Sequence, residues 1–161
     1  MTDVSAIKSL ASDIRVLYVE DDSQLRDKTA AYFKKIFSHV DVAQDGQDGL
    51  KHFQENRYDI VFTDVQMPFM NGIEMISEIK TLNNEQEVVI ISAYGDVKYM
   101  IDAIRLGVNG YIIKPINYEQ MNLILFRTLK KIVHARENAM YKNHLEELAE
   151  ERQRVDNPRK R

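Results

Sequence analysis

The sequence predicts an α/β fold in which helices cover both faces of a doubly wound, five-stranded parallel sheet. Short apolar runs recur along the chain at fairly even spacing, at residues 16–19, 40–43, 60–62, 88–91 and 111–113. These runs are rich in β-branched and aromatic side chains and mostly lack polar alternation, which is typical of strands buried on both faces. A helical pattern separates each run from the next, and strict alternation of strands and helices indicates a parallel sheet.

The helices are predicted from apolar residues that recur at helical spacing after each strand. Asp22 is suitably placed to cap the first of them, and Gly107 is placed to end the fourth. The helices are expected at residues 23–37, from about 46 to 53, at 73–79, at 97–104 and from 121 onward.

Length and composition suit one domain of ordinary size with an appendage. The chain has 161 residues, of which 44% are hydrophobic and 29% charged, so it has enough apolar material for a core. A formal net charge of −3 gives no overall attraction to nucleic acid or to an anionic membrane. The basic cluster at 159–161 is more simply a solvated terminus than a binding patch.

Several classes of protein are excluded by what the chain lacks. It has no cysteine, which excludes disulfides, thiolate catalysis and the usual structural zinc sites. No apolar run approaches the roughly 18 to 20 residues of a membrane span. Residues 1–13 contain three charged side chains, Asp3, Lys8 and Asp13, rather than the apolar core of a signal peptide. We therefore expect a cytoplasmic chain with no membrane association.

Helical character continues past the point where a compact domain should end. We expect an N-terminal extension at 1–12, a compact domain at 13–130, a helical linker or coiled coil at 131–156 and a basic tail at 157–161. A stripe with alternating spacings of four and three residues runs through Tyr141, Leu145, Leu148, Arg152 and Val155. This stripe is shorter than two heptads, so a solvated linker, a dimerising coiled coil and a helix that binds another partner all remain open.

Polar residues follow four of the predicted strands at their carboxyl ends. They are Glu20-Asp21-Asp22, Asp64, Ser92 and Lys114-Pro115. In open α/β sheets, function collects in the crevice beyond these strand ends. Each residue has a structural explanation when it is taken alone, as a helix cap, a turn residue or a surface lysine. Their joint occurrence at four strand ends indicates a functional site.

The charges of this cluster predict what it binds. Several carboxylates in one crevice repel one another and stay ionised only if cations compensate them. Lys114 supplies one positive charge, and a hard divalent ion, most naturally Mg²⁺, prefers oxygen ligands such as these. An anion that arrives there would bind through the metal, Lys114 and the loop amides, and a phosphoryl group fits this description.

These residues resemble the signature of response regulator receiver domains. The resemblance rests on Val-Glu-Asp-Asp at 19–22, Asp-Val-Gln-Met-Pro at 64–68 with Asn71-Gly72, Ser92-Ala93 and Lys114-Pro115, and it covers roughly residues 13–130. It implies a flavodoxin-like (βα)5 fold. It also implies that Asp64 is the nucleophile that accepts a phosphoryl group from a partner histidine kinase or phosphotransfer protein. The chain would then be a signalling domain that catalyses only its own phosphorylation and dephosphorylation.

The resemblance also implies the roles of the residues around Asp64. Asp21 would bind Mg²⁺ directly, Glu20 largely through water, and Asp64 and the backbone carbonyl of Gln66 would complete the protein ligands, with Mn²⁺ as an alternative ion. Lys114 would pair with the phosphoryl oxygens. The same resemblance suggests a cis peptide bond between Lys114 and Pro115.

The resemblance further implies how the phosphorylated state is read. Ser92 would move toward the phosphoryl group, and Tyr111 would turn inward as the switch aromatic. The output surface would comprise the predicted helix at 97–104, the strand at 111–113 and the helix expected from residue 121 onward. Gln66 and Tyr94, two residues beyond Asp64 and Ser92, would tune the lifetime of the phosphoryl group.

Three other classes fit the sequence less well. Haloacid-dehalogenase-like phosphohydrolases need a second aspartate two residues after the nucleophile, where this chain has Gln66. A dinucleotide-binding domain needs a glycine-rich turn after the first strand, where this chain has three acidic residues. A degenerate receiver that only binds proteins would have lost part of the Asp64, Asp21, Ser92 and Lys114 set, which is complete here.

The sequence leaves the output open. It contains no helix-turn-helix, cyclase or complete kinase motif. Residues 145–152 look like the linkers that precede a further domain, which makes the chain a candidate fragment of a longer protein. His134 and His144 lack the surroundings of a kinase phospho-acceptor and are expected as exposed helix residues. Homodimerisation through the last helix and residues 131–156 is the protein contact expected besides the kinase.

Overall fold

A computed structural model of the chain describes residues 3–93, 95 and 97–157. Within these residues, helices and strands alternate after a first short helix. The elements are α1 (Val4–Leu10), β1 (Arg15–Val19), α2 (Ser23–Lys34), β2 (His39–Ala43), α3 (Gly46–Glu55), β3 (Ile60–Thr63), α4 (Gly72–Leu82), β4 (Glu87–Ser92), α5 (Val97–Arg105), β5 (Gly110–Ile113) and α6 (Tyr118–Asp156). Because α1 precedes the first strand, the five predicted helices correspond to α2 through α6.

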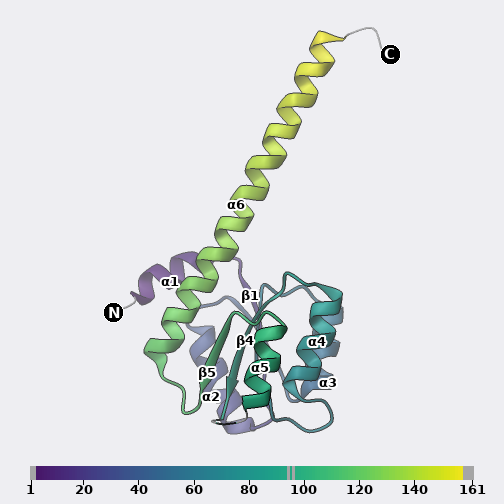
Figure 1. Ribbon diagram of the computed structural model, residues 1–161. Coiled ribbons are helices and arrows are strands. Elements are labelled where there is room, and N and C mark those ends of the chain that lie inside the picture. The colour runs from purple at the N-terminus through teal and green to yellow at the C-terminus, as the bar shows by residue number, and fades with distance from the viewer. Residues whose placement is uncertain (1–2, 94, 96, 158–161) are drawn as a thin grey trace.

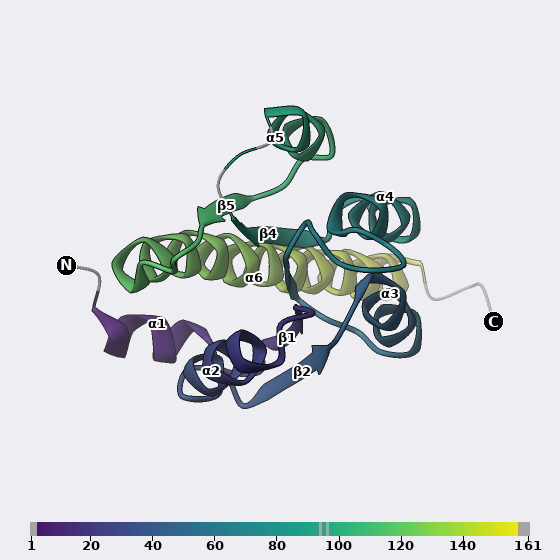
Figure 2. The same cartoon turned by 90° about the horizontal axis from the view of Figure 1, so that it is seen from below.

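The strands form one five-stranded parallel sheet, which confirms the predicted fold class. Their order is β2-β1-β3-β4-β5, and every neighbouring pair is parallel. Figure 2 shows α3, α4 and α5 on one side of the sheet, and α2 and α6 on the other. The order reverses at β1, because the chain moves outward from β1 to β2 and then crosses back to β3. Such a reversal opens a crevice at the carboxyl ends of the strands.

The alternation of side chains along the strands divides the core between the two faces. Val16 and Tyr18 of β1 pack with α2 and α6, whereas Leu17 and Val19 pack with α3 and α4. All four side chains are fully buried. Since successive residues of a strand point to opposite faces, a strand with both faces covered must be apolar throughout. This is why the apolar runs of the sequence show no polar alternation.

The predicted helix ends agree with the structure. The side chain of Asp22 accepts a hydrogen bond from the backbone N–H of Leu25 at 3.0 Å and so caps α2. Gly107 follows α5 with φ +73°, the left-handed conformation that commonly ends a helix. Asn157 caps the end of α6.

Helix α1 is a feature that the sequence did not predict. Residues before the first strand were expected as an extension with no assigned structure, but Val4–Leu10 form a helix that packs against α6 (Figure 1). Ile7, Ala11 and Ile14 are buried in the same apolar cluster as the inner face of α6. The helix has only 7 residues, so its stability comes from this packing rather than from a local pattern.

Helix α6 has 39 residues and continues well past the sheet (Figure 1). Its first half buries Met121, Leu125, Leu129 and Ile132 against the sheet. Two ion pairs then hold it to the amino-terminal edge of the sheet: Lys131 with Glu87 at 2.7 Å, and Arg136 with Asp59.

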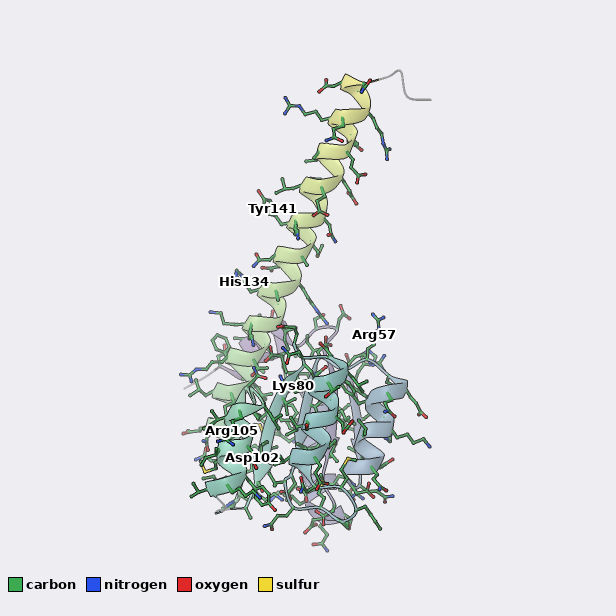
Figure 3. The ribbon with its side chains drawn as sticks, turned by 45° about the vertical axis from the view of Figure 1, so that its right-hand side comes forward. Arg57, Lys80, Asp102, Arg105, His134 and Tyr141 are labelled. Atoms are coloured by element: carbon green, nitrogen blue, oxygen red, sulfur yellow. The ribbon has the colours of Figure 1, made fainter. Side chains whose placement is uncertain are left out.

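Beyond residue 136 the side chains of α6 are exposed. Figure 3 shows Tyr141 on this projecting part, clear of the sheet and its helices. His134 and His144 are also exposed, as predicted. No helix in the described part of the chain combines the length and the apolar character that crossing a membrane requires.

The packing of α1 predicts its contribution to stability. Replacing the fully buried Ile7 with alanine should lower the free energy of unfolding by about 2–4 kcal/mol, because it leaves a cavity against α6. Val4→Ala in the same helix, where the side chain is 42% exposed, should change it by no more than about 0.5 kcal/mol. Urea denaturation measures both, and equal effects of the two substitutions would show that α1 does not dock on α6.

Candidate functional site

The predicted polar residues meet at one edge of the sheet because their strands are parallel and in register. Val19 of β1 pairs with Thr63 of β3, and Ser92 of β4 pairs with Ile113 of β5. The residues that follow or end these strands therefore come together at the carboxyl edge. The set comprises Glu20, Asp21, Asp64, Ser92 and Lys114.

Asp64 lies at the centre of this set and is 6% exposed. One carboxylate oxygen, Oδ1, accepts hydrogen bonds from the Ser92 hydroxyl at 2.8 Å and from the backbone N–H of Val65 at 2.6 Å. The N–H of Gln66 adds a longer bond to the same oxygen at 3.3 Å. The other oxygen, Oδ2, accepts from Lys114 Nζ at 2.7 Å. The carboxylate is therefore held in one orientation by partners on three elements of the chain.

Lys114 joins Asp64 to a second buried carboxylate. Its Nζ lies 2.8 Å from Glu20 Oε2, and Glu20 is only 1% exposed. Burial by itself lowers the pKa of Lys114, but hydrogen bonds and negative charge from Asp64 and Glu20 outweigh burial, so this pKa is raised. The ammonium group therefore keeps its charge at neutral pH.

The negative charge of Glu20 is less well compensated by its surroundings than the positive charge of Lys114. Burial raises the pKa of Glu20, and the charge of Asp64 raises it further, although hydrogen bonds from Lys114 and Asp22 act in the opposite direction. The Tyr18 hydroxyl donates to Glu20 Oε2 at 3.4 Å, and burial raises the pKa of Tyr18 so that it remains a donor. The crevice thus carries more negative charge than its own cation balances.

The carboxylates are arranged as a divalent cation requires. Glu20, Asp21 and Asp64 can each direct one oxygen so that these atoms lie within 4.8 Å of one another. Asp21 is exposed, whereas the other two are buried, so an ion bound there would contact both protein and water. Oxygen ligands with room for retained water are what Mg²⁺ prefers. The residues present therefore fit this ion.

The loop after Asp64 is folded back against it. The N–H of Gly72 donates to the carbonyl oxygen of Val65 at 2.8 Å, and Asn71 and Glu74 form a capping box at the start of α4. A Cβ on Gly72 would lie 2.0 Å from the carbonyl oxygen of Asp64, so only glycine allows this close approach. The loop thereby fixes the backbone that presents Asp64.

The remaining predicted residues lie around this centre. Gln66 is exposed and contributes its backbone N–H, and Tyr111 of β5 is half-buried beside the cluster on the α3–α5 side of the sheet. Tyr94 lies outside the described residues. The peptide bond between Lys114 and Pro115 is cis, as the resemblance suggested.

Two residues that the sequence did not predict as part of the site contact Glu20 in the structure. Tyr18 contacts Glu20, and Arg26 donates to the backbone carbonyl of Glu20 at 2.8 Å. Tyr18 was predictable from strand alternation, since residues 18 and 20 point to the same face. The contact of Arg26 depends on how α2 packs, which local pattern does not reveal.

The raised pKa of Glu20 predicts a pH dependence of stability in Mg²⁺-free buffer. Above the ordinary value of 4.5 the folded state holds this proton more tightly than the unfolded state, so the free energy of unfolding should fall as pH rises. Glu20→Gln removes the ionisation and should flatten this slope. Urea denaturation between pH 4.5 and 7.5 with EDTA measures it, and the exposed Glu78→Gln serves as the control. Parallel slopes for wild type and Glu20→Gln would contradict the prediction.

Comparisons with known proteins agree with this geometry. The family described as response regulator receiver domain matches residues 16–126. The regulatory protein AtoC of Escherichia coli is 30% identical over 116 residues, which are 72% of this chain and 25% of AtoC. A cyclic di-GMP phosphodiesterase of Thermotoga maritima is 34% identical over 131 residues, 80% of this chain and 33% of that protein. This chain therefore spans about a quarter to a third of the length of these curated relatives.

Solved structures show the same fold. The N-terminal domain of an uncharacterized protein from Wolinella succinogenes superposes with a TM-score of 0.68 at 33% identity, covering 78% of this chain and 98% of that one. A response regulator receiver domain protein from Clostridium thermocellum gives a TM-score of 0.69 at 25% identity, covering 73% and 95% respectively. The match covers the sheet from the second residue of β1 onward and every member of the polar cluster, and the chain belongs to the response regulator receiver domains of two-component systems.

Proposed function

We propose that Asp64 accepts a phosphoryl group from a phosphohistidine on a histidine kinase or phosphotransfer protein, in a Mg²⁺-dependent reaction. The observation that carries this proposal is the set of contacts at the Asp64 carboxylate. Lys114 lies at 2.7 Å, the Ser92 hydroxyl at 2.8 Å, and the carboxylates of Glu20 and Asp21 are near enough to share a cation. Each group matches a requirement of phosphoryl transfer, namely a nucleophile, a cation and donors for the transferred oxygens.

In the proposed reaction an oxygen of the Asp64 carboxylate attacks the phosphorus of the phosphohistidine. A P–O bond forms and the P–N bond breaks, and the electron pair of that bond leaves with the imidazole of the donor. The product on this chain is an acyl phosphate. Lys114 would shift from the carboxylate to a phosphoryl oxygen, and the Ser92 hydroxyl and loop N–H groups would donate to the others.

Mg²⁺, with Mn²⁺ as an alternative, would supply positive charge to the phosphoryl oxygens when bound. Asp21 would hold it directly, Glu20 largely through water, and Asp64 and the backbone carbonyl of Gln66 would complete the protein ligands. The surplus negative charge of the crevice supports this assignment, because Lys114 alone faces two buried carboxylates. Arrival of the dianionic phosphoryl group would increase that surplus, which makes a second cation necessary.

We propose that Ser92 and Tyr111 convert phosphorylation into a change of shape. Ser92 already donates to Asp64, so it is positioned to follow a phosphoryl oxygen. Tyr111 lies on the next strand, where Ile90 of β4 is its register partner, and would turn further inward. Gln66 and Tyr94 would tune how long the phosphoryl group survives hydrolysis.

The output of this change would leave through α5, β5 and α6. On α5 the side chains of Val97, Met100, Ile101 and Ile104 are exposed, from 40% for Met100 to 76% for Ile104. Ile113 of β5 is also exposed, at 38%. An apolar surface of this kind is typical of a protein-binding site. We further propose that residues 13–130 form the receiver unit and residues 131–156 the segment that relays its state.

The proposed chemistry predicts Mg²⁺-dependent labelling of Asp64. Acetyl phosphate with Mg²⁺ should add one phosphoryl group to the chain, because it presents the same reactive phosphorus without needing a protein donor. Intact-protein mass spectrometry measures the addition. EDTA or Asp64→Asn should abolish it, and Lys114→Met should slow it by about a hundredfold or more, the loss typical of removing one stabilising donor.

Beryllofluoride, a phosphoryl mimic, distinguishes a phospho-acceptor from a module that only binds proteins. With Mg²⁺ it should bind the wild-type chain and not Asp64→Asn. A wild-type chain that neither reacts with acetyl phosphate nor binds beryllofluoride would contradict the proposed function.

The exposed stripe on α6 predicts dimerisation that depends on phosphorylation. Leu145 and Leu148 are each 48% exposed and lie at heptad spacing with Tyr141 and Val155, so pairing of two α6 helices would bury them. Light scattering should show a larger mass with beryllofluoride than without it. Leu145→Asp should prevent this increase, whereas Asn143→Asp, outside the stripe, should not. An unchanged mass and unchanged helix packing in both states would exclude the relay through α6.

A further inference from the structure

Phe69 stands out in the loop between β3 and α4. Its side chain is 81% exposed, a larger fraction than that of any other large hydrophobic residue in the described part of the chain. Its backbone has φ +67°, in the left-handed region that bulky side chains seldom adopt. The flanking methionines behave differently, since Met67 and Met70 pack against the core beneath the loop.

Both properties make phenylalanine unfavourable for folding at this position. A left-handed backbone is unfavourable for a residue with a bulky side chain, and asparagine or glycine would avoid most of that cost. Exposure of the ring also gives up the favourable free energy that burial of such a side chain contributes. A single exposed apolar residue needs no explanation, but one held in a strained conformation does. Among the described residues, the Phe69 ring belongs to neither apolar cluster, so no burial of the side chain offsets this conformation.

The loop holds Phe69 rigidly. The N–H of Gly72 donates a hydrogen bond to the carbonyl of Val65, and the N–H of Met70 donates one to the carbonyl of Pro68 at 2.8 Å. Gly46 of α3 lies directly against the loop, since a Cβ there would be 2.2 Å from the carbonyl oxygen of Met70. A side chain presented by a fixed backbone loses little conformational freedom on binding, which favours affinity.

Phe69 also lies within reach of whatever protein serves Asp64. Gly72 abuts the carbonyl of Asp64, and three residues of chain span at most about 11 Å from Gly72 to Phe69. Even a small transient interface buries about 600 Å² on each partner, which corresponds to a radius of about 14 Å. A partner that brings a histidine side chain to the nearly buried Asp64 must centre its surface there. A footprint of this size is large enough to reach the β3–α4 loop.

We propose that Phe69 is the docking anchor for the protein that presents phosphohistidine to Asp64, and that it enters an apolar groove beside that histidine. This inference rests on the proposed function and adds the residue by which the donor is held. Rigid aromatic side chains are frequent binding hot spots. Phe69 contributes affinity for the protein donor and takes no part in the phosphoryl transfer itself, so a small phosphodonor does not depend on it.

The test compares two donors on the full chain. Phosphorylated cytoplasmic cores of the histidine kinases of the encoding organism are screened, and the one that transfers fastest to the wild-type chain is the protein donor; acetyl phosphate with Mg²⁺ is the small donor. Phe69→Asn should raise KM for the kinase core about tenfold or more while leaving kcat and the acetyl phosphate rate unchanged. Phe69→Tyr should retain most of the wild-type KM. Leu82→Ala removes another exposed apolar side chain, at the far end of α4, and should have no effect.

Stability separates a lost contact from a lost fold. Asparagine tolerates the left-handed backbone, so Phe69→Asn should unfold at a urea concentration equal to or above that of the wild-type chain. An unchanged KM for the kinase core, or equal slowing with both donors, would overturn the inference and leave the proposed function in place. The inference would also be overturned if no kinase core phosphorylates a chain that reacts with acetyl phosphate. Failure of acetyl phosphate and beryllofluoride with the wild-type chain would instead reject the proposed function.

Discussion

The ammonium group of Lys114 lies 2.8 Å from the buried carboxylate of Glu20 and 2.7 Å from that of Asp64. This contact depends on the arrangement of the sheet. Two carboxylates this deeply buried are stable only with a cation between them. The three residues follow β1, β3 and β5, so the contact forms only if those strands are parallel, in register and in the observed order. The apolar strands and the helices on both faces provide that register. In the proposed reaction Lys114 would also bind the incoming phosphoryl group, and the contact with Asp64 keeps the ammonium group beside the carboxylate that would be phosphorylated.

Much of this arrangement was predictable from the sequence. The unbroken apolar strands indicate burial on both faces, and a residue at or just after the end of such a strand must lie at the carboxyl edge. The sequence alone therefore predicts that these residues meet there: Glu20, Asp21, Asp64, Ser92 and Lys114. Their individual roles remain predictions, and so does the role of Tyr111 as a switch, because these roles concern the phosphorylated state.

Other features could not be read from local pattern because distant contacts decide them. Helix α1 is too short to be stable alone and exists through the burial of Ile7 against α6. The left-handed backbone of Phe69 follows from the way Gly72 closes the loop, where local preference would favour another conformation. The ion pairs of Lys114 agree with its predicted role as a cation among the carboxylates, but which carboxylates it contacts depends on how the ends of β1, β3 and β5 meet in space.

The direction of α6 determines where two binding partners would lie on the domain. The helix starts near the carboxyl edge that holds Asp64, crosses the sheet, and leaves past Glu87 and Asp59 at the opposite edge. The 20 residues that follow Arg136, up to Asp156, carry it about 30 Å farther at 1.5 Å per residue. A donor docked over Asp64 and a molecule engaged by the far end of α6 would thus occupy opposite poles. A partner that binds the far end of α6 would therefore not compete sterically with a donor over Asp64.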